Sequence, residues 1–325
     1  MPPEIRLARR LIERRGLLPP VDVENILREY AHVEFVDFPV PIDGLCLNLK
    51  ALGQKPTVLV SKRIPPFRRR FTLAHELGHV LIPWHLGSII DEIDGANGDV
   101  DNFQLEAEAN RFASELLMPS DWVKEQIILA ENPLDALFLV HDVASVSLQA
   151  ASIKFADCLA PNYVIASSSG GTVDWSARSR GTLAGTVRRG TDLNLANPFP
   201  FPCDRWSRVF QGISYDLWYF GKLENFETDG VEGPWRRILD QIVGEIISDE
   251  IGQKKFKLSV NGVTSNANGM VRSERRLEAV ISAMRQRLYA SATSDKRYGD
   301  LVNHTKFRDF CVARASDYIA RRSRQ

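Results

Sequence analysis

Residues 66–81 read PFRRRFTLAHELGHVL and contain the stretch that decides the fold, His75-Glu76-Leu77-Gly78-His79. Pro65-Pro66 precedes this stretch and Pro83 follows it, so the pattern predicts one helix that ends near Leu81. Four residues make slightly more than one helical turn, so the two imidazoles leave one face of the helix. We therefore expect both histidines to bind one metal ion.

The opposite side of the same helix is apolar. Leu73, Leu77, Val80 and Leu81 fall there, which gives the helix a back that can face the core while the histidines face a cleft. Gly78 costs about 1 kcal/mol of helix propensity relative to alanine. An interior glycine that is kept despite this cost predicts that another segment packs closely against it.

Two imidazoles do not complete a catalytic zinc site, which normally has three protein ligands and one open position. The third ligand is expected from residues 103–118, which have helical periodicity up to Pro119. Helical projection places Glu106 on one face with Asn110. We therefore predict Glu106 as the third ligand and Asn110 as a residue that hydrogen-bonds a ligand from behind.

The other face of this second helix carries Glu108, Arg111 and Glu115. Arg111 and Glu115 are four residues apart and are predicted to pair. Glu108 stays open as the alternative third ligand. The His-Glu-x-x-His pattern itself arises by chance in roughly one random chain in a hundred of this length, given average residue frequencies. The matching second helix argues against that explanation.

Glu76 is expected to have a different role from the ligands. It projects about 100° away from His75, so it can reach a water molecule beside the metal without occupying the metal's coordination sites. Zinc in such a site lowers the pKa of water toward about 7 and polarises the scissile carbonyl. Glu76 then acts as general base and returns the proton to the leaving amine. The predicted activity is peptide hydrolysis with one Zn²⁺ per chain and no covalent intermediate.

Two segments resemble the ImmA/IrrE family of metallopeptidases: RRFTLAHELGH at 69–79 and EAEANRFASELLMP at 106–119. The resemblance covers residues 1 to about 158. Carried over residue by residue, it implies zinc ligands at His75, His79 and Glu106. It implies the catalytic glutamate at Glu76. The implied fold is that of a zincin-like, gluzincin-type peptidase.

The resemblance also implies a substrate. Members of this family cut a helix-turn-helix repressor and thereby derepress phage, mobile-element, DNA-damage or anti-phage defence genes. Such members are typically narrow proteases. Some relatives carry a GAF-like sensor domain after the peptidase domain, and this is the expectation for residues 159–325.

Around the two motif helices, the sequence predicts an α+β fold. Residues 4–15 and 21–30 are predicted as helices. The runs Val33–Phe38, Leu45–Leu49 and Thr57–Ser61 are predicted to form a small antiparallel sheet. An extended substrate peptide can add beside Thr57–Ser61 if that run is the sheet edge next to the cleft.

Later segments complete two predicted domains. Residues 87–102 are expected to be an exposed, acidic loop, and 121–158 to form two or three helices. A metallopeptidase domain therefore spans 1–158, including the helical segment 121–158, and an α+β regulatory or sensor domain spans 159–325. The elements expected in the second domain are strands at Tyr163–Ser167, Ile213–Tyr219 and Phe256–Val260 and helices near 234–251, 272–290 and 305–322.

Composition limits the class of protein. The chain has 325 residues, of which 44% are hydrophobic and 25% charged, as in folded globular proteins. Lys and Arg number 41, as do Asp and Glu, so no global field marks a nucleic acid or a membrane as partner. The four cysteines are scattered singly, and no run reaches the roughly 18 apolar residues of a membrane span. We expect a cytoplasmic protein with no membrane partner.

Three weaker signals have two interpretations each. Cys46 is either a thiol switch that places a thiolate on the metal or a buried apolar-like residue. His85 is close enough in sequence to the motif to be a candidate oxyanion stabiliser, although its spacing is not that of a ligand.

Residues 271–325 carry 13 Lys and Arg against six Asp and Glu. With their interspersed aromatics they can bind single-stranded DNA or another activating ligand, or they form a solvated helix face over core aromatics.

The leading hypothesis has two rivals. One is a nucleic-acid-binding transcriptional regulator in which the zinc site is not catalytic. The other is a less selective, toxin-like protease. The helix-turn-helix-like spacing of Leu134–Phe155 gives the regulator little support, because residues 121–158 carry six acidic residues against two lysines.

Overall fold

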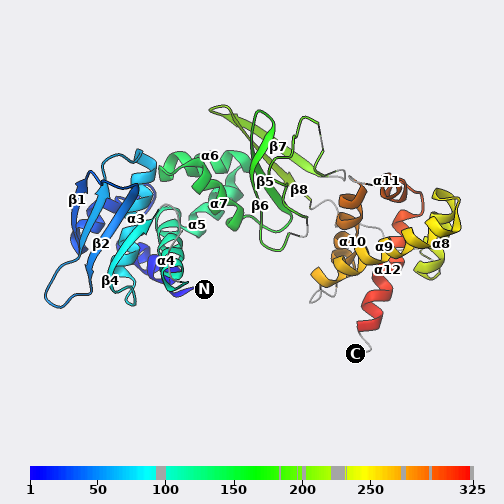
Figure 1. Ribbon diagram of the computed structural model, residues 1–325, viewed down its shortest axis with the longest axis horizontal. Helices are drawn as coiled ribbons and strands as arrows, with labels where there is room; N and C mark the ends of the chain where they lie inside the picture. The colour runs from blue at the N-terminus through cyan, green and yellow to red at the C-terminus, as the bar shows by residue number, and fades with distance from the viewer. Residues whose placement is uncertain are drawn as a thin grey trace. The chain divides into compact units, whose positions relative to one another are not determined.

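The computed structural model describes residues 1–92, 100–182, 184–195, 197–199, 203–220, 231, 233–271, 276–292 and 295–322 (Figure 1). The chain divides into two compact units, Met1–Leu159 and Ala160–Gln325. The division falls one residue beyond the expected domain boundary. Within the described ranges, no helix combines the length and the apolar composition that a membrane span requires.

Unit 1, Met1–Leu159, contains seven helices and four strands among its described residues. Both predicted N-terminal helices, the motif helix and the helix that carries Glu106 are present, and residues 121–158 hold three helices rather than two. The elements in order are α1 Pro3–Arg15, α2 Val23–Tyr30, β1 His32–Val36, β2 Ile42–Leu49, β3 Thr57–Ser61, α3 Pro66–Leu81, β4 Gly87–Glu92, α4 Val100–Leu117, α5 Ser120–Leu129, α6 Pro133–Ala144 and α7 Leu148–Cys158.

The sheet of unit 1 has the order β1-β3-β2-β4. β2 is antiparallel to β3 and to β4, but β1 is parallel to β3, so the expectation of a purely antiparallel sheet was wrong. The chain reverses once between β1 and β2 and again between β2 and β3, which leaves β1 and β3 running in the same direction. β3 therefore lies between two strands, and the predicted addition of a peptide beside Thr57–Ser61 has no free edge to use.

The expected loop at 87–102 is also only partly present. Gly87–Glu92 forms β4, whose Ile89 pairs with Cys46 and is buried. α4 begins at Val100, earlier than the predicted start at Phe103. Acidic residues in the sequence suggested a solvated loop, but pairing with β2 and burial of the apolar Ile89 side chain hold this segment in the sheet. The rest of the predicted loop, residues 93–99, lies outside the described residues.

α3 is held closely on two sides. A Cβ on Gly78 would lie 3.2 Å from a ring carbon of Phe112 and 3.3 Å from the Cα of Ala109, so α3 and α4 cross almost backbone to backbone. The predicted close packing at Gly78 is thereby confirmed. At the C-terminal end of α3, the Nζ of Lys50 donates to the carbonyls of His79 and Val80 at 3.0 and 2.6 Å. This contact satisfies carbonyls that a helix end leaves without partners.

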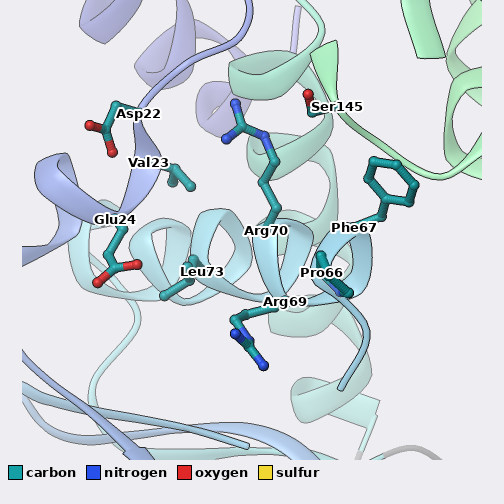
Figure 2. A pocket seen from close by; sticks show the side chains of 9 residues that line it. All are labelled: Asp22, Val23, Glu24, Pro66, Phe67, Arg69, Arg70, Leu73 and Ser145. Atoms are coloured by element: carbon teal, nitrogen blue, oxygen red, sulfur yellow. The ribbon is translucent and has the colours of Figure 1, made fainter. Parts of the chain in front are cut away.

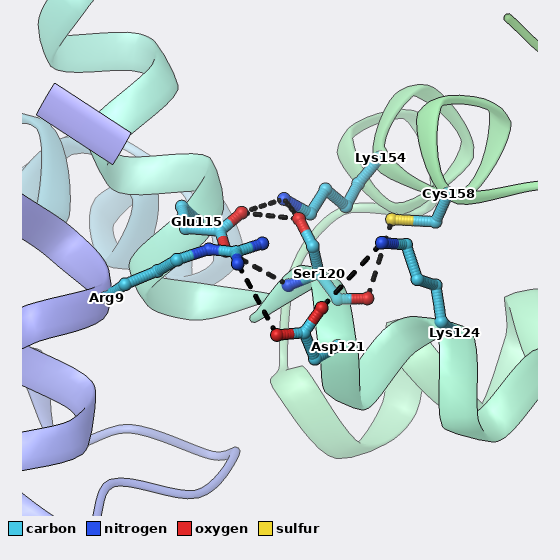
Figure 3. A network of polar contacts seen from close by, with 7 residues as sticks. All are labelled: Arg9, Glu115, Ser120, Asp121, Lys124, Lys154 and Cys158. Atoms are coloured by element: carbon cyan, nitrogen blue, oxygen red, sulfur yellow. Dashed lines mark hydrogen bonds and ion pairs between the residues drawn. The ribbon is translucent and has the colours of Figure 1, made fainter. Parts of the chain in front are cut away.

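The outer side of α4 is tied to three other helices by a buried carboxylate. Glu115, 2% exposed, accepts from Arg9 of α1 at 2.8 Å, Ser120 of α5 at 2.6 Å and Lys154 of α7 at 2.6 Å (Figure 3). The predicted Arg111–Glu115 pair is therefore wrong, and Arg111 donates instead to Glu4 of α1. Partners that are remote in sequence replace the local pair because α1 packs along α4.

Unit 2, Ala160–Gln325, combines an antiparallel sheet of order β6-β5-β8-β7 with helices that share a second core. The expected strand Phe256–Val260 is wrong: both residues are buried one turn apart in α9, whose first turn Asp249 caps. The GAF-like layout stays a prediction. The elements of this unit are β5 Tyr163–Ser169, β6 Thr172–Arg178, β7 Asp204–Phe210, β8 Ile213–Tyr219, α8 Trp235–Ile246, α9 Glu250–Met270, α10 Leu277–Ala292, α11 Lys296–Val302 and α12 Phe307–Arg322.

Replacing Lys154 by methionine should destabilise unit 1 by about 3 kcal/mol, because Glu115 would remain buried with one charged partner fewer. Burial acts to raise the pKa of Glu115, but Lys154, Ser120 and Arg9 together outweigh it and the pKa is lowered. Stability from this carboxylate is thus complete above its unfolded pKa and is lost as the pH falls through its folded pKa. Lys154→Met should flatten that acid dependence.

Hydrogen exchange of α4 and α7 amides in the full chain, followed against pH, measures both effects. The control is Lys124→Met, because Lys124 lies half-exposed in the same network and pairs only with exposed Asp121 at 3.7 Å. Equal exchange rates in the two variants would contradict a stabilising role for the buried pair.

Candidate metal centre

Three side chains predicted as metal ligands meet in unit 1. His75 and His79 of α3 and Glu106 of α4 each offer a ligand atom, and these atoms lie within 4.8 Å of one another. The two histidine Nε2 atoms are 2.9 Å apart. Oxygens of Glu106 lie 3.0 Å from Nε2 of His75 and 3.3 Å from Nε2 of His79. The close crossing at Gly78 brings the two helices together at this point.

The spacing and the donor set fit a tetrahedral metal ion. Metal–ligand bonds of about 2.0–2.1 Å give a tetrahedron with edges of roughly 3.3 Å, close to the distances between these donors. Two imidazoles and one carboxylate form a ligand set of catalytic zinc sites. The histidine side chains are 3% and 1% exposed, whereas that of Glu106 is 22% exposed. Access to the group is therefore greater beside Glu106 than beside the imidazoles.

The protonation states suit metal binding. Burial lowers the pKa of His79 to about 4, so its imidazole is neutral near pH 7 and has a nitrogen lone pair to offer. Burial also acts to raise the pKa of Glu106, but the adjacent rings of His75 and His79 outweigh burial and lower the pKa to about 2. A charged carboxylate beside a neutral ring is the combination that a divalent cation stabilises.

Each imidazole has a polar partner at its other nitrogen. Nδ1 of His75 lies 2.9 Å from Oδ1 of Asn110, where helical projection places that side chain. Nδ1 of His79 lies 2.8 Å from Nδ1 of His85, whose Nε2 lies 3.2 Å from Oε2 of Glu108. Both nitrogens of His85 are therefore engaged behind His79, which leaves neither for an oxyanion. Glu108 contacts the ring of His85 and is not a member of the ligand group.

Glu76 lies in a cradle made by β2. The thiol of Cys46 donates to Oε2 of Glu76 at 2.8 Å, and a Cβ on Gly44 would collide with the other carboxylate oxygen. Burial raises the pKa of Cys46 well above its usual value, and the charge of Glu76 raises it further. The thiol is thus protonated and bonded to Glu76, which argues against the thiol switch and for the buried, apolar-like alternative. No local pattern in the sequence predicts that Gly44 lies against Glu76.

A separate pocket of about 450 Å³ opens at the start of α3. Arg70 lines this pocket (Figure 2). It donates to the carbonyls of Val21 and Ala144, which joins α3 to the segment before α2 and to the last residue of α6. None of His75, His79 and Glu106 lines this pocket. The Arg70 side chain is used in structural contacts, and the candidate metal ligands lie outside this pocket.

The basic segment 271–325 offers few rings for stacking on bases. Tyr298, Phe307 and Phe310 are buried in the core of unit 2, and Tyr289 is half-buried. The guanidinium of Arg314 lies 3.9 Å from the ring centroid of Trp235, so that pair is also used internally. These contacts favour the solvated-face interpretation over binding of single-stranded DNA.

Comparisons with known proteins agree with the metal centre. The family described as the IrrE N-terminal-like domain matches residues 29–153. The radiation response metalloprotease IrrE of Deinococcus deserti is 29% identical over 133 residues, which cover 38% of this chain and 47% of that protein. The match therefore spans about half the length of this curated relative. Both findings show that the N-terminal part of the chain is similar to proteins of a metallopeptidase family.

The solved structure of a Mycobacterium tuberculosis transcriptional regulator superposes on this chain with a TM-score of 0.40 and 11% identity, over 67% of this chain and 88% of that one. Similarity at this level supports no statement about a shared fold or function.

Glu106→Gln should lose metal, because the amide removes the charge that two imidazoles face and a carboxylate ligand with it. We expect near-stoichiometric zinc in the wild type after dialysis and less than about a tenth of that in the variant. Elemental analysis of the folded protein gives the stoichiometry. Glu125→Gln is the matched control, since Glu125 is an exposed glutamate of α5 in the same unit. Full zinc in Glu106→Gln would exclude Glu106 as a ligand.

Proposed function

We propose, on the premise that residues 29–153 belong to the ImmA/IrrE family of metallopeptidases, that this chain is a cytoplasmic zinc-dependent endopeptidase. His75, His79 and Glu106 would hold the zinc, and Glu76 would be the general base. The observation that carries the proposal is the meeting of these three donors from α3 and α4, with Glu76 next to His75 on α3. When bound, zinc supplies a lowered water pKa and a polarised substrate carbonyl.

The chain's own residues orient the base. The carboxylate of Glu76 is 1% exposed, and the thiol of Cys46 donates to one of its oxygens. Held against Gly44, the carboxylate has little freedom to rotate. It takes a proton from the attacking water as the C–O bond forms, and it then gives this proton to the leaving amine nitrogen as the C–N bond breaks. No covalent intermediate with the protein is needed.

An extended substrate would bind at a sheet edge other than the one first expected. In the described part of the sheet, β4 pairs with β2 only, so its second edge has backbone groups free to pair with a peptide. β4 starts at Gly87, two residues after His85, which contacts His79. β4 is therefore close in sequence to the residues behind the metal centre, which supports its edge as the proposed substrate site.

The substrate class follows from the family resemblance. We propose a helix-turn-helix transcriptional repressor, whose cleavage derepresses stress, DNA-damage, mobile-element or anti-phage defence genes. The similarity to a radiation response metalloprotease of Deinococcus deserti supports a role in a stress response. An activating ligand would act through unit 2.

Glu76→Gln should keep zinc and lose cleavage by at least about 100-fold, because an amide cannot accept the proton. The measurement is cleavage of the purified helix-turn-helix protein encoded nearest to this gene, alongside a proteome-derived peptide library analysed by mass spectrometry. Elemental analysis verifies the metal. Glu34→Gln, an exposed glutamate of β1, is the control. Cleavage at the wild-type rate by Glu76→Gln would remove the proposed base.

Gly44→Ala gives a second variant with Glu76 unchanged. The added methyl group would displace the carboxylate, so zinc should remain while cleavage falls. Specific DNA binding with a transcriptional effect that persists in Glu76→Gln would favour a regulator with a non-catalytic metal. Proteome-wide cleavage would favour a less selective protease.

A further inference from the structure

A second polar layer lies behind His79. His85 follows Pro83 in the segment between α3 and β4, and Glu108 lies on α4 two residues beyond Glu106. Nδ1 of His79 lies 2.8 Å from Nδ1 of His85, and Nε2 of His85 lies 3.2 Å from Oε2 of Glu108. His85 is 0% and Glu108 7% exposed, so water does not replace these contacts.

We propose that His85 and Glu108 are positioning residues that form a relay, His79–His85–Glu108, and that this relay sets the tautomer and the metal affinity of His79. The inference rests on the metal centre of the proposed function but not on peptidase chemistry. It assigns Glu108, first considered as an alternative ligand, to the opposite side of the histidine. It also assigns His85, first considered for an oxyanion, to the metal centre.

Hydrogen-bond chemistry fixes the direction of the relay. An ionised carboxylate only accepts, so Nε2 of His85 must donate to Glu108. A neutral imidazole carries one N–H, and therefore Nδ1 of His85 is an acceptor. The partner across the 2.8 Å contact, Nδ1 of His79, must then be the donor. Nε2 of His79 is left without a hydrogen, which is the form that binds a metal ion.

Glu108 is itself held in place. The indole N–H of Trp84 donates to its Oε2 at 2.5 Å, and the amide of Gln104 donates to its Oε1 at 3.0 Å. With His85, three donors therefore surround this one carboxylate. An anchored acceptor fixes the plane of the His85 ring, and through it the plane of the His79 ring. The relay is a preformed part of the centre.

The two metal-binding imidazoles are supported differently. His75 faces a neutral amide oxygen on Asn110, whereas His79 is connected through His85 to a carboxylate. A carboxylate raises the basicity of an imidazole more than an amide does, because it stabilises the positive charge that metal binding places on the ring. α4 thus supplies carboxylates on both sides of His79, Glu106 at Nε2 and Glu108 through His85.

A double-mutant cycle on zinc affinity tests the relay in the full chain. Glu108→Gln and His85→Phe should each weaken zinc binding by about 10- to 100-fold. Combined, they should weaken it no more than the stronger single change, because Glu108 acts only through His85. The dissociation constant is measured at neutral pH by competition with a chromophoric chelator, and circular dichroism of the metal-free proteins verifies folding.

The matched control uses the other imidazole. Asn110→Ala acts on His75, so combined with Glu108→Gln its effect should multiply rather than saturate. His85→Gln should retain most of the affinity, since its amide can accept from His79 and donate to Glu108. If His85→Phe does not fold, His85→Ala replaces it in the cycle.

If Glu108→Gln weakens zinc binding by the same factor in His85→Phe as in the wild type, the relay is overturned. Unchanged zinc affinity in both single variants would also overturn it. Peptidase activity does not enter this measurement. An inactive protein with the predicted affinity cycle would refute the proposed function and leave the relay standing, whereas an active protein without the cycle would do the reverse.

Discussion

The near contact between the backbones of α3 and α4 at Gly78 is the constraint on which the metal centre depends. Two donors come from one helix and the third from the other, so the distance between the helix axes sets the size of the coordination space. Ala109 lies against Gly78, and no flexible side chain stands between them to adjust the gap. Any larger residue at position 78 must move Glu106 away from the histidines or distort α3.

The outer face of α4 is held as firmly as its inner face. α1 binds it at two points, through Glu4 to Arg111 and through Arg9 to Glu115, and Lys154 of α7 approaches Glu115 from another direction. These pairs have buried carboxylates, whose desolvation is offset only when the partners stay in place. The helix that carries Glu106 is therefore fixed between α3 and the surrounding helices, which holds Glu106 beside the two histidines.

Local periodicity predicted much of this arrangement. His75, His79, Glu106 and Asn110 were selected because each helical face is legible from spacing alone, and the structure brings their side chains together. One error is local: a run as short as Phe256–Val260 does not distinguish a strand from a helix by periodicity, and it lies within α9. The other errors arose where remote residues decide. The direction of β1 depends on the strand that separates it from β2. Similarly, no local rule connects Glu4 with Arg111 or His85 with Glu108.

The contact between Cys46 and Glu76 has a consequence for oxidants. Peroxides oxidise cysteine through its thiolate form. A reactive thiol would therefore be a poor partner for a carboxylate that must keep one geometry. Cys46 has no exposed surface, and its pKa is raised well above the ordinary range. Both features disfavour formation and attack of the thiolate. The hydrogen bond that orients Glu76 can then persist in a cell whose exposed thiols are already being converted to sulfenic acids.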